Sequence, residues 1–288
     1  MLDHLITPFA EFDFMQRALV GVVAIAVGGG PVGVFLMLRR MSLTGDAMAH
    51  AILPGAAVGY LVAGLSLPAM TLGGLVAGVI VAVLAGLVAR LTELKEDASL
   101  AAFYLLSLAL GVTIVSLRGS NVDLLHVLFG TVLALDDPAL LLLAAIASVT
   151  LVALALLYRP LVLECVDPTF LRSVSRAGTP THLIFLGLVV LNLVGGFHAL
   201  GTLLAVGMMM LPAAAARFWS ADITLMILVA TLIGIASGAA GLLLSYHYEL
   251  PAGPAIILTA GAIYLFSLAV GTKGGLVWLA RPRRHLEA

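Results

Sequence analysis

Long apolar runs divide almost the whole chain, and this pattern constrains the possible folds more than any other feature. A helix needs about 20 apolar residues to cross the hydrocarbon layer of a bilayer. Runs of this kind occupy residues 15–38, 46–64, 68–89, 98–117, 139–158, 181–197, 200–217, 222–245 and 252–272. Only 10% of the residues are charged, against about 25% in soluble domains. We therefore predict an all-α polytopic membrane protein with eight or nine transmembrane helices, since one short run could be re-entrant.

The remaining segments are short, which predicts a single transmembrane domain over residues 1–288. Within residues 1–14, apolar residues recur at helical spacing, so a short helix is expected at the membrane surface before the first span. The net charge of -1 gives no reason to expect a nucleic-acid partner. The single cysteine, Cys165, argues against an internal disulfide and a cysteine-rich metal site.

The distribution of Lys and Arg predicts the orientation, because cytoplasmic loops of membrane proteins carry an excess of both. With the N-terminus outside, all but two of the basic residues fall on the cytoplasmic side. These are Arg39, Arg40, Arg90, Lys95, Arg159, Arg172, Arg176, Arg217, Lys273, Arg281, Arg283 and Arg284. Only Arg17 and Arg118 remain at the outer face. We therefore expect a multi-pass protein of the plasma membrane with its C-terminus in the cytoplasm.

Asp46 and His50 are ionisable residues within the second apolar run. Their spacing places both side chains on one face of a helix. Ionisable residues are costly in hydrocarbon, so they mark a functional site by default. A carboxylate oxygen and an imidazole nitrogen aimed at one point also form half of a divalent-metal site. The alternative is a hydrogen-bonded polar pair that locks two helices together.

One chain supplies too few ligands for a complete site of this kind, because zinc or manganese binds about four to six. A two-fold dimer would bring two copies of Asp46 and His50 to a shared axis. Small residues on helix faces would permit such packing. The pairs with this spacing are Gly29 and Gly33, Gly55 and Gly59, Gly74 and Gly78, and Gly234 and Gly238.

Two prolines interrupt apolar runs close to candidate ligands. Pro54 has no N–H, so the carbonyl of His50 loses its helical partner and becomes a candidate third ligand. Pro212 likewise frees the carbonyl of Met208, whose thioether is either a soft ligand or gap-filling packing. His198 precedes the same span and is either an entry ligand or a solvated interfacial residue.

The longest predicted cytoplasmic loop covers residues 159–180. Asp167 followed by Pro168 is typical of a helix start, and Gly178 is typical of a helix end. A short helix with Phe170 as an apolar anchor is therefore expected. A cytoplasmic partner could bind it, or it lies at the interface with no partner. No Walker A motif occurs in the chain, so ATP hydrolysis would belong to another polypeptide.

Four blocks of the sequence are specific enough to indicate a family. They lie at residues 38–55, 125–130, 166–168 with 177–178, and 201–217. With these blocks the whole chain resembles the membrane permeases of bacterial ABC importers for zinc, manganese and iron(II). The resemblance implies that Asp46 and His50 are metal ligands in the translocation path. It also implies that the helix from Asp167 to Gly178 couples the permease to its ATPase.

The resemblance further implies partners: cytoplasmic ATP-binding cassette subunits, an extracytoplasmic metal-binding protein and a second permease subunit, most simply an identical one. The chain would then be a transport subunit of the bacterial inner membrane and not an enzyme. It would carry zinc, manganese or iron as cargo, without a permanently bound cofactor. One alternative is a secondary metal carrier, although no further acidic residues lie mid-span for a proton relay. The other is an intramembrane metal-dependent hydrolase, which would need a general base, and no Glu lies within a predicted span.

Overall fold

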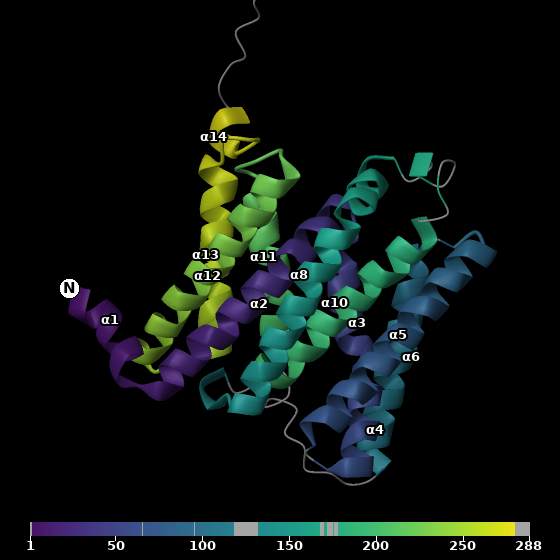
Figure 1. Cartoon of the computed structure of the whole chain (residues 1–288), viewed down its shortest axis with the longest axis horizontal. Coiled ribbons are helices and arrows are strands. Elements are labelled where there is room, and N and C mark those ends of the chain that lie inside the picture. The colour runs from purple at the N-terminus through teal and green to yellow at the C-terminus, as the bar shows by residue number, and fades with distance from the viewer. Residues whose placement is uncertain are drawn as a thin grey trace, which may run out of the picture.

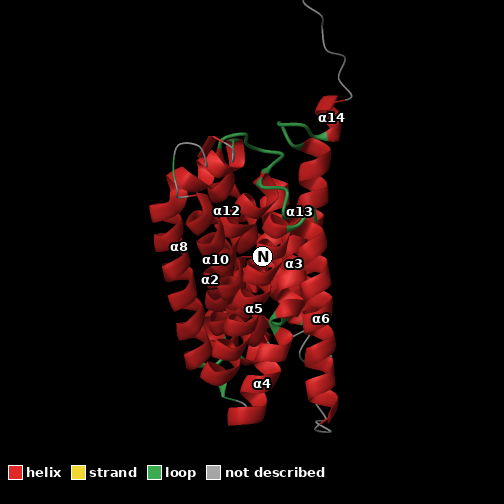
Figure 2. Cartoon of the chain, turned by 90° about the vertical axis from the view of Figure 1, so that its right-hand side faces the viewer, coloured by secondary structure: helices red, strands yellow, loops and turns green. Residues whose placement is uncertain are grey.

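The structure is a computed structural model and describes residues 2–64, 66–94, 96–117, 132–167, 170–171, 175 and 178–279. Over these residues every regular element is helical (Figure 2). In chain order the elements are α1 (Leu2–Glu11), α2 (Asp13–Leu38), α3 (Ser42–Ala51), α4 (Leu53–Ala63), α5 (Leu67–Leu91), α6 (Glu96–Leu117), η1 (Val132–Ala134), α8 (Asp137–Val166), α10 (Gly178–Leu200), α11 (Thr202–Ala216), α12 (Ile223–Tyr248), α13 (Ala252–Val270) and α14 (Leu276–Leu279).

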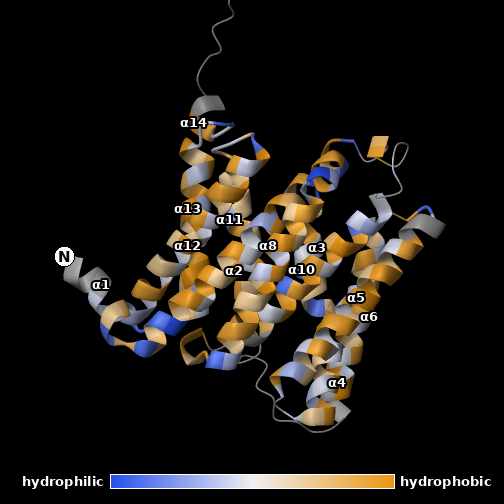
Figure 3. Cartoon of the chain, in the orientation of Figure 1, coloured by the Kyte–Doolittle hydropathy of each residue, from blue (hydrophilic) through white to orange (hydrophobic). Residues whose placement is uncertain are grey.

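The number and length of the apolar helices agree with a membrane-spanning bundle. Seven candidate spans are long and apolar enough to cross a bilayer, with α3 and α4 together forming one of them. Two shorter apolar helices, Ala98–Ile114 and Thr202–Ala216, occupy the remaining predicted runs. Hydrophobic residues cover the helices along most of their length (Figure 3). The predicted all-α membrane protein is confirmed.

From α2 onwards, successive spans run in alternating directions through the bundle, with α3 and α4 together forming one span (Figure 1). The end of α8, the start of α10 and the short helix α14 lie at one end of the molecule, and α4 lies at the other. α1 forms the separate short helix expected at the N-terminus and contacts α2 and α12. The chain thus brings the end of α2 close to the last turn of α8 and the first turns of α10.

Helix α2 is the centre of the packing, and its sequence allows close approach on several sides. It contacts α8, α10, α11 and α12. A Cβ atom at Gly33 would lie 1.9 Å from the backbone oxygen of Met209 on α11. On other sides of the helix, Gly28 faces Asn192 of α10 and Gly30 faces Thr231 of α12. Small residues are needed here because the helix backbones themselves are in contact.

The glycine pairs expected to permit dimer packing include glycines that pack against other helices of the same chain. A Cβ atom at Gly55 would lie 2.0 Å from the oxygen of Gly73, where α4 crosses α5. At Gly238 on α12, it would lie 2.0 Å from the side chain of Val22 on α2. These pairs account for crossings within one chain, so they do not locate a dimer interface.

The loop predicted over residues 159–180 is shorter in the structure, because the helices on both sides extend into this range. Both predicted ends of the loop were therefore wrong. α8 continues through Pro160 to Val166, and α10 begins at Gly178. The extra turns of α8 are held by tertiary contacts, since Leu161 is fully buried and Glu164 is paired with an arginine from α2. Tertiary contacts of this kind override the local preference for a break at proline.

Candidate metal centre

Asp46 and His50 both lie on α3, on the shared face that their spacing predicts. The Nε2 atom of His50 is 3.9 Å from Oδ1 of Asp46. This distance is too long for a hydrogen bond, so the two side chains are not locked to each other. The side chain of Asp46 is 66% exposed and that of His50 is 31% exposed. Both candidate side chains are therefore partly accessible on this face of α3.

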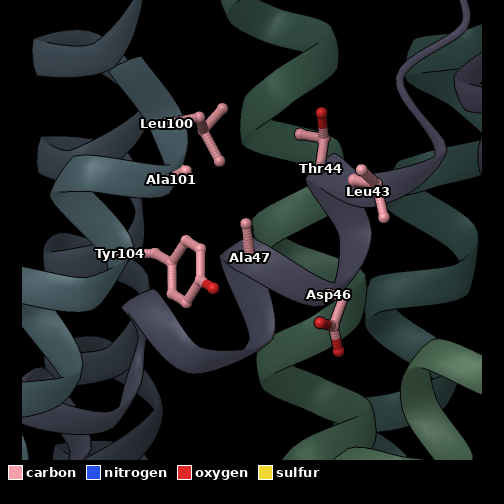
Figure 4. A pocket seen from close by; sticks show the side chains of 7 residues that line it. All are labelled: Leu43, Thr44, Asp46, Ala47, Leu100, Ala101 and Tyr104. Atoms are coloured by element: carbon pink, nitrogen blue, oxygen red, sulfur yellow. The ribbon is translucent and has the colours of Figure 1, made fainter. Parts of the chain in front are cut away.

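A cavity of about 160 Å³ opens beside Asp46 (Figure 4). It is lined by Leu43, Thr44, Asp46, Ala47, Leu100, Ala101 and Tyr104, and the last three belong to α6. The ring of Tyr104 also lies beside the imidazole of His50, with ring centres 6.2 Å apart and planes at 30°. The cavity has room for several water molecules, each of which takes about 30 Å³ in the liquid. A partly hydrated cation would fit beside the carboxylate.

The backbone around the site is broken where Pro54 removes a helical N–H. α3 and α4 are separated at Ile52. The Oγ atom of Ser107 on α6 donates a 2.8 Å hydrogen bond to the carbonyl of Ala51. A Cβ atom at Gly111, one turn further on, would lie 3.1 Å from the nitrogen of Pro54. α6 therefore packs directly on the break and satisfies one of the backbone groups beside it.

The second proline segment does not bring Met208 to this site. α11 continues through Pro212 to Ala216 without a break. Met208 is fully buried in a cluster with Val22 and Leu242, and the hydroxyl of Ser237 contacts its sulfur at 3.9 Å. The packing interpretation of Met208 therefore fits the structure, and the ligand interpretation does not.

Two other methionines do reach the neighbourhood of Asp46. The terminal methyl groups of Met210 and Met209 lie 2.9 and 3.0 Å from the position of a Cβ atom at Gly45. The sequence singled out Met208 from this run, whereas Met209 and Met210 are the members that contact α3 at Gly45. His198 lies in the last turn of α10, and its side chain is outside the described residues.

The predicted coupling segment is described only in part. The Oδ1 atom of Asp167 accepts a 2.9 Å hydrogen bond from the N–H of Phe170, as an N-cap residue does. The N–H groups of Leu171 and Ser175 bond to the carbonyls four residues earlier, at 3.2 and 2.9 Å. Pro168 lies outside the described residues. Gly178 is the first residue of α10, so its expected role as a helix end was wrong.

Sequence reasoning missed a buried charged cluster. Nη2 of Arg39, at the end of α2, lies 3.1 Å from Oε1 of Glu164 on α8, and His182 of α10 is next to both. Glu164 was assigned to a loop, so the expectation that no span contains a Glu was also wrong: the last turn of α8 contains one. Nothing in the local sequence predicts this pairing, because Arg39 and Glu164 are 125 residues apart in the chain.

The candidate centre is incomplete in one chain. Across the described residues, no group of three or more His, Cys, Asp or Glu side chains is placed to hold a metal ion. Asp46 and His50 therefore remain two candidate ligands, one anionic oxygen and one nitrogen, which is fewer than a complete site needs. The Nδ1 atom of His50 is buried and, within the described part of the chain, has no hydrogen-bond partner.

Comparison with known proteins identifies the family. Residues 11–271 match the profile of ABC-3, described as the ABC 3 transport family. The chain belongs to the ABC 3 transport family. This family member is 31% identical to the manganese import system permease protein ScaB of Streptococcus parasanguinis over 273 residues, which cover 95% of this chain and 96% of the relative. It is 29% identical to the manganese transport system membrane protein MntC of Halalkalibacterium halodurans over 282 residues, covering 96% of this chain and 95% of the relative.

The structural comparison agrees with the sequence comparison. PsaBC from Streptococcus pneumoniae, solved in complex with Fab, matches with a TM-score of 0.85 and 28% identity, covering 98% of this chain and 100% of the other. Within the ABC 3 family the chain is a transport subunit, and ATP hydrolysis belongs to a separate subunit, as the resemblance implied. The alternatives of a secondary carrier and an intramembrane hydrolase have no support from these relatives.

Proposed function

We propose that this chain is the membrane permease of an ATP-driven importer that carries Mn²⁺ into the cytoplasm, with Asp46 and His50 as its metal ligands. One observation carries the proposal. The carboxylate of Asp46 lies beside the imidazole of His50, and its side chain is 66% exposed, although α3 belongs to an apolar span. A carboxylate facing lipid costs up to about 3 kcal/mol at the centre of a span, and Asp46 is the fifth residue of its span, so a charged or polar partner is expected to cover it.

A second copy of the chain and a cation would together provide that cover. Two copies of Asp46 and His50 supply four ligands, and the two carboxylates balance the charge of a divalent ion. Mn²⁺ accepts about six ligands, so water would fill the remaining positions, for which the cavity beside Asp46 has room. The names of the relatives favour manganese over the zinc and iron that the ligand types also accept.

The orientation and partners follow from the same proposal. The predicted orientation places the segment between α8 and α10 in the cytoplasm, where ATPase subunits would bind it. An extracytoplasmic binding protein would deliver the ion at the opposite face. The basic residues at the ends of α2, α11 and α13 lie at the same end of the bundle as this segment, which supports the orientation (Figure 1).

The test is uptake of radioactive Mn²⁺ by the permease assembled with its ATPase and binding protein in proteoliposomes. Asp46→Asn removes the carboxylate charge and His50→Gln removes the imidazole nitrogen, while side-chain size changes little. We expect each to lower ATP-dependent uptake by about tenfold or more, since even outer-shell changes at metal sites cost about 10–100-fold. Asp137→Asn, which removes an exposed carboxylate from α8, is the matched control and should transport normally.

Two results would contradict the proposal at different levels. Normal Mn²⁺ uptake by both variants, at equal amounts of assembled complex, would remove Asp46 and His50 from the path. A wild-type complex that hydrolyses ATP but accumulates no Mn²⁺ would remove manganese import as the function, and parallel measurements with Zn²⁺ and Fe²⁺ would show which ion is carried.

A further inference from the structure

Three buried polar side chains from three helices meet at the end of the bundle where α8 ends and α10 begins. Nη2 of Arg39 donates a 3.1 Å hydrogen bond to Oε1 of Glu164 and also contacts Nδ1 of His182. The Glu164 oxygen lies 3.9 Å from the same nitrogen of His182. The guanidinium carbon of Arg39 is 5.1 Å from the centre of the Phe185 ring. All three polar side chains are only 7–8% exposed.

This cluster, Arg39, Glu164 and His182, joins both ends of the predicted ATPase-binding segment. Glu164 lies in the last turn of α8, three residues before Asp167. His182 lies in the second turn of α10, four residues after Gly178. A force applied to the segment between these helices would therefore reach the arginine from both sides.

On its other side, Arg39 is tied closely to the helix that carries the candidate metal ligands. It is the C-cap residue of α2, directly after Leu38, and α3 begins at Ser42. Arg40 has a left-handed backbone with φ of 59°, and the N–H of Met41 bonds to the carbonyl of Leu36 at 2.9 Å. This is the Schellman pattern of a helix end, so the connection from Arg39 to α3 is short and hydrogen-bonded.

Stability alone is a poor explanation for the cluster. Burying an ion pair carries a desolvation penalty that often cancels the attraction, and apolar residues of similar size frequently serve as well. The pairing is also incomplete, because Nη1 of Arg39 and Oε2 of Glu164 are buried and, among the described residues, have no hydrogen-bond partner. Each of these atoms can take a different partner if the helices move, which suits a cluster with two arrangements.

We propose that Arg39, Glu164 and His182 are positioning residues that link movement of the segment between α8 and α10 to the position of α3. When the ATPase displaces that segment, the ends of α8 and α10 carry Glu164 and His182 with them. Arg39 follows these two partners and moves the start of α3, and with it Asp46 and His50. The inference rests on the proposed import function and adds the route by which ATP hydrolysis acts on the metal site.

The decisive measurement is the ratio of Mn²⁺ ions taken up to ATP molecules hydrolysed by the complete complex in proteoliposomes. Glu164→Gln leaves the arginine without its counter-charge. We expect this variant to hydrolyse ATP and to bind Mn²⁺, with a transport ratio lower by about tenfold or more, since small displacements of a site are costly. Asp137→Asn on the same helix breaks the exposed ion pair with Arg17, with an N···O distance of 3.1 Å, and should keep the wild-type ratio.

A double variant separates positioning from folding. Replacing Arg39 and Glu164 together by Met removes both charges, and such replacements are often neutral or stabilising for the fold. We expect an assembled complex that hydrolyses ATP with the same low transport ratio. A wild-type ratio in either assembled variant would overturn the inference while leaving the proposed function intact. Absence of ATP-driven Mn²⁺ uptake in the wild-type complex would instead contradict the proposed function.

Discussion

Replacing Gly33 by alanine should disturb the crossing of α2 and α11 more than any exposed substitution. The added Cβ would lie 1.9 Å from the carbonyl oxygen of Met209, where ordinary contact begins near 3.4 Å. The two backbones would have to separate by roughly 1.5 Å, enough to lose much of their dispersion attraction. Overpacking costs about 1–3 kcal/mol, and a backbone clash belongs at the upper end. The gain in helix propensity of about 1 kcal/mol leaves a net loss of about 2 kcal/mol.

Gly187→Ala on α10 is the matched control, because a Cβ atom there meets no other atom within 4 Å. It should gain about 1 kcal/mol from helix propensity alone, so the two variants should differ by about 3 kcal/mol. Denaturant titration of the purified chain in one detergent measures this difference. Because α11 also places Met209 beside Gly45, Gly33→Ala should lower Mn²⁺ uptake as well. Equal stability of the two alanine variants would refute the argument that backbone contact determines this crossing.

Two further predictions concern the segments on either side of α3. Ser107→Ala leaves the carbonyl of Ala51 without its donor, which should cost about 1–3 kcal/mol and lower the thermal midpoint. Thr113→Ala, which removes a hydroxyl bonded only within the exposed face of α6, should have little effect; equal midpoints for the two variants would contradict this role of Ser107. Arg40→Gly should raise the free energy of unfolding by about 1 kcal/mol, and with it the thermal midpoint, since glycine adopts the left-handed backbone at this position without strain. A lower midpoint would show that the Arg40 side chain makes a stabilising contact.

Several features of this protein are properties of short stretches of chain, and these could be predicted. The length of an apolar run decides whether a helix can cross a bilayer, so the helices were found where the runs lie. A spacing of four residues decides that Asp46 and His50 share a face of one helix. A proline decides where a helix loses a hydrogen bond, and the chain is interrupted at Ile52, two residues before Pro54. Each of these consequences is decided within one continuous stretch of chain.

Other features depend on which helices become neighbours, and no local pattern encodes that. Gly33 could have packed against another subunit, but it packs against the carbonyl of Met209 because α11 crosses α2 at that point. Met209 and Met210, and not Met208, reach Gly45 because the rotation of α11 about its axis turns them towards α3. Arg39 meets Glu164 and His182, which are 125 and 143 residues away in the chain, only when the end of α2 lies beside the end of α8 and the start of α10. Burial of charge and close backbone contact are properties of the assembled bundle, and so they follow from packing and not from spacing along the chain.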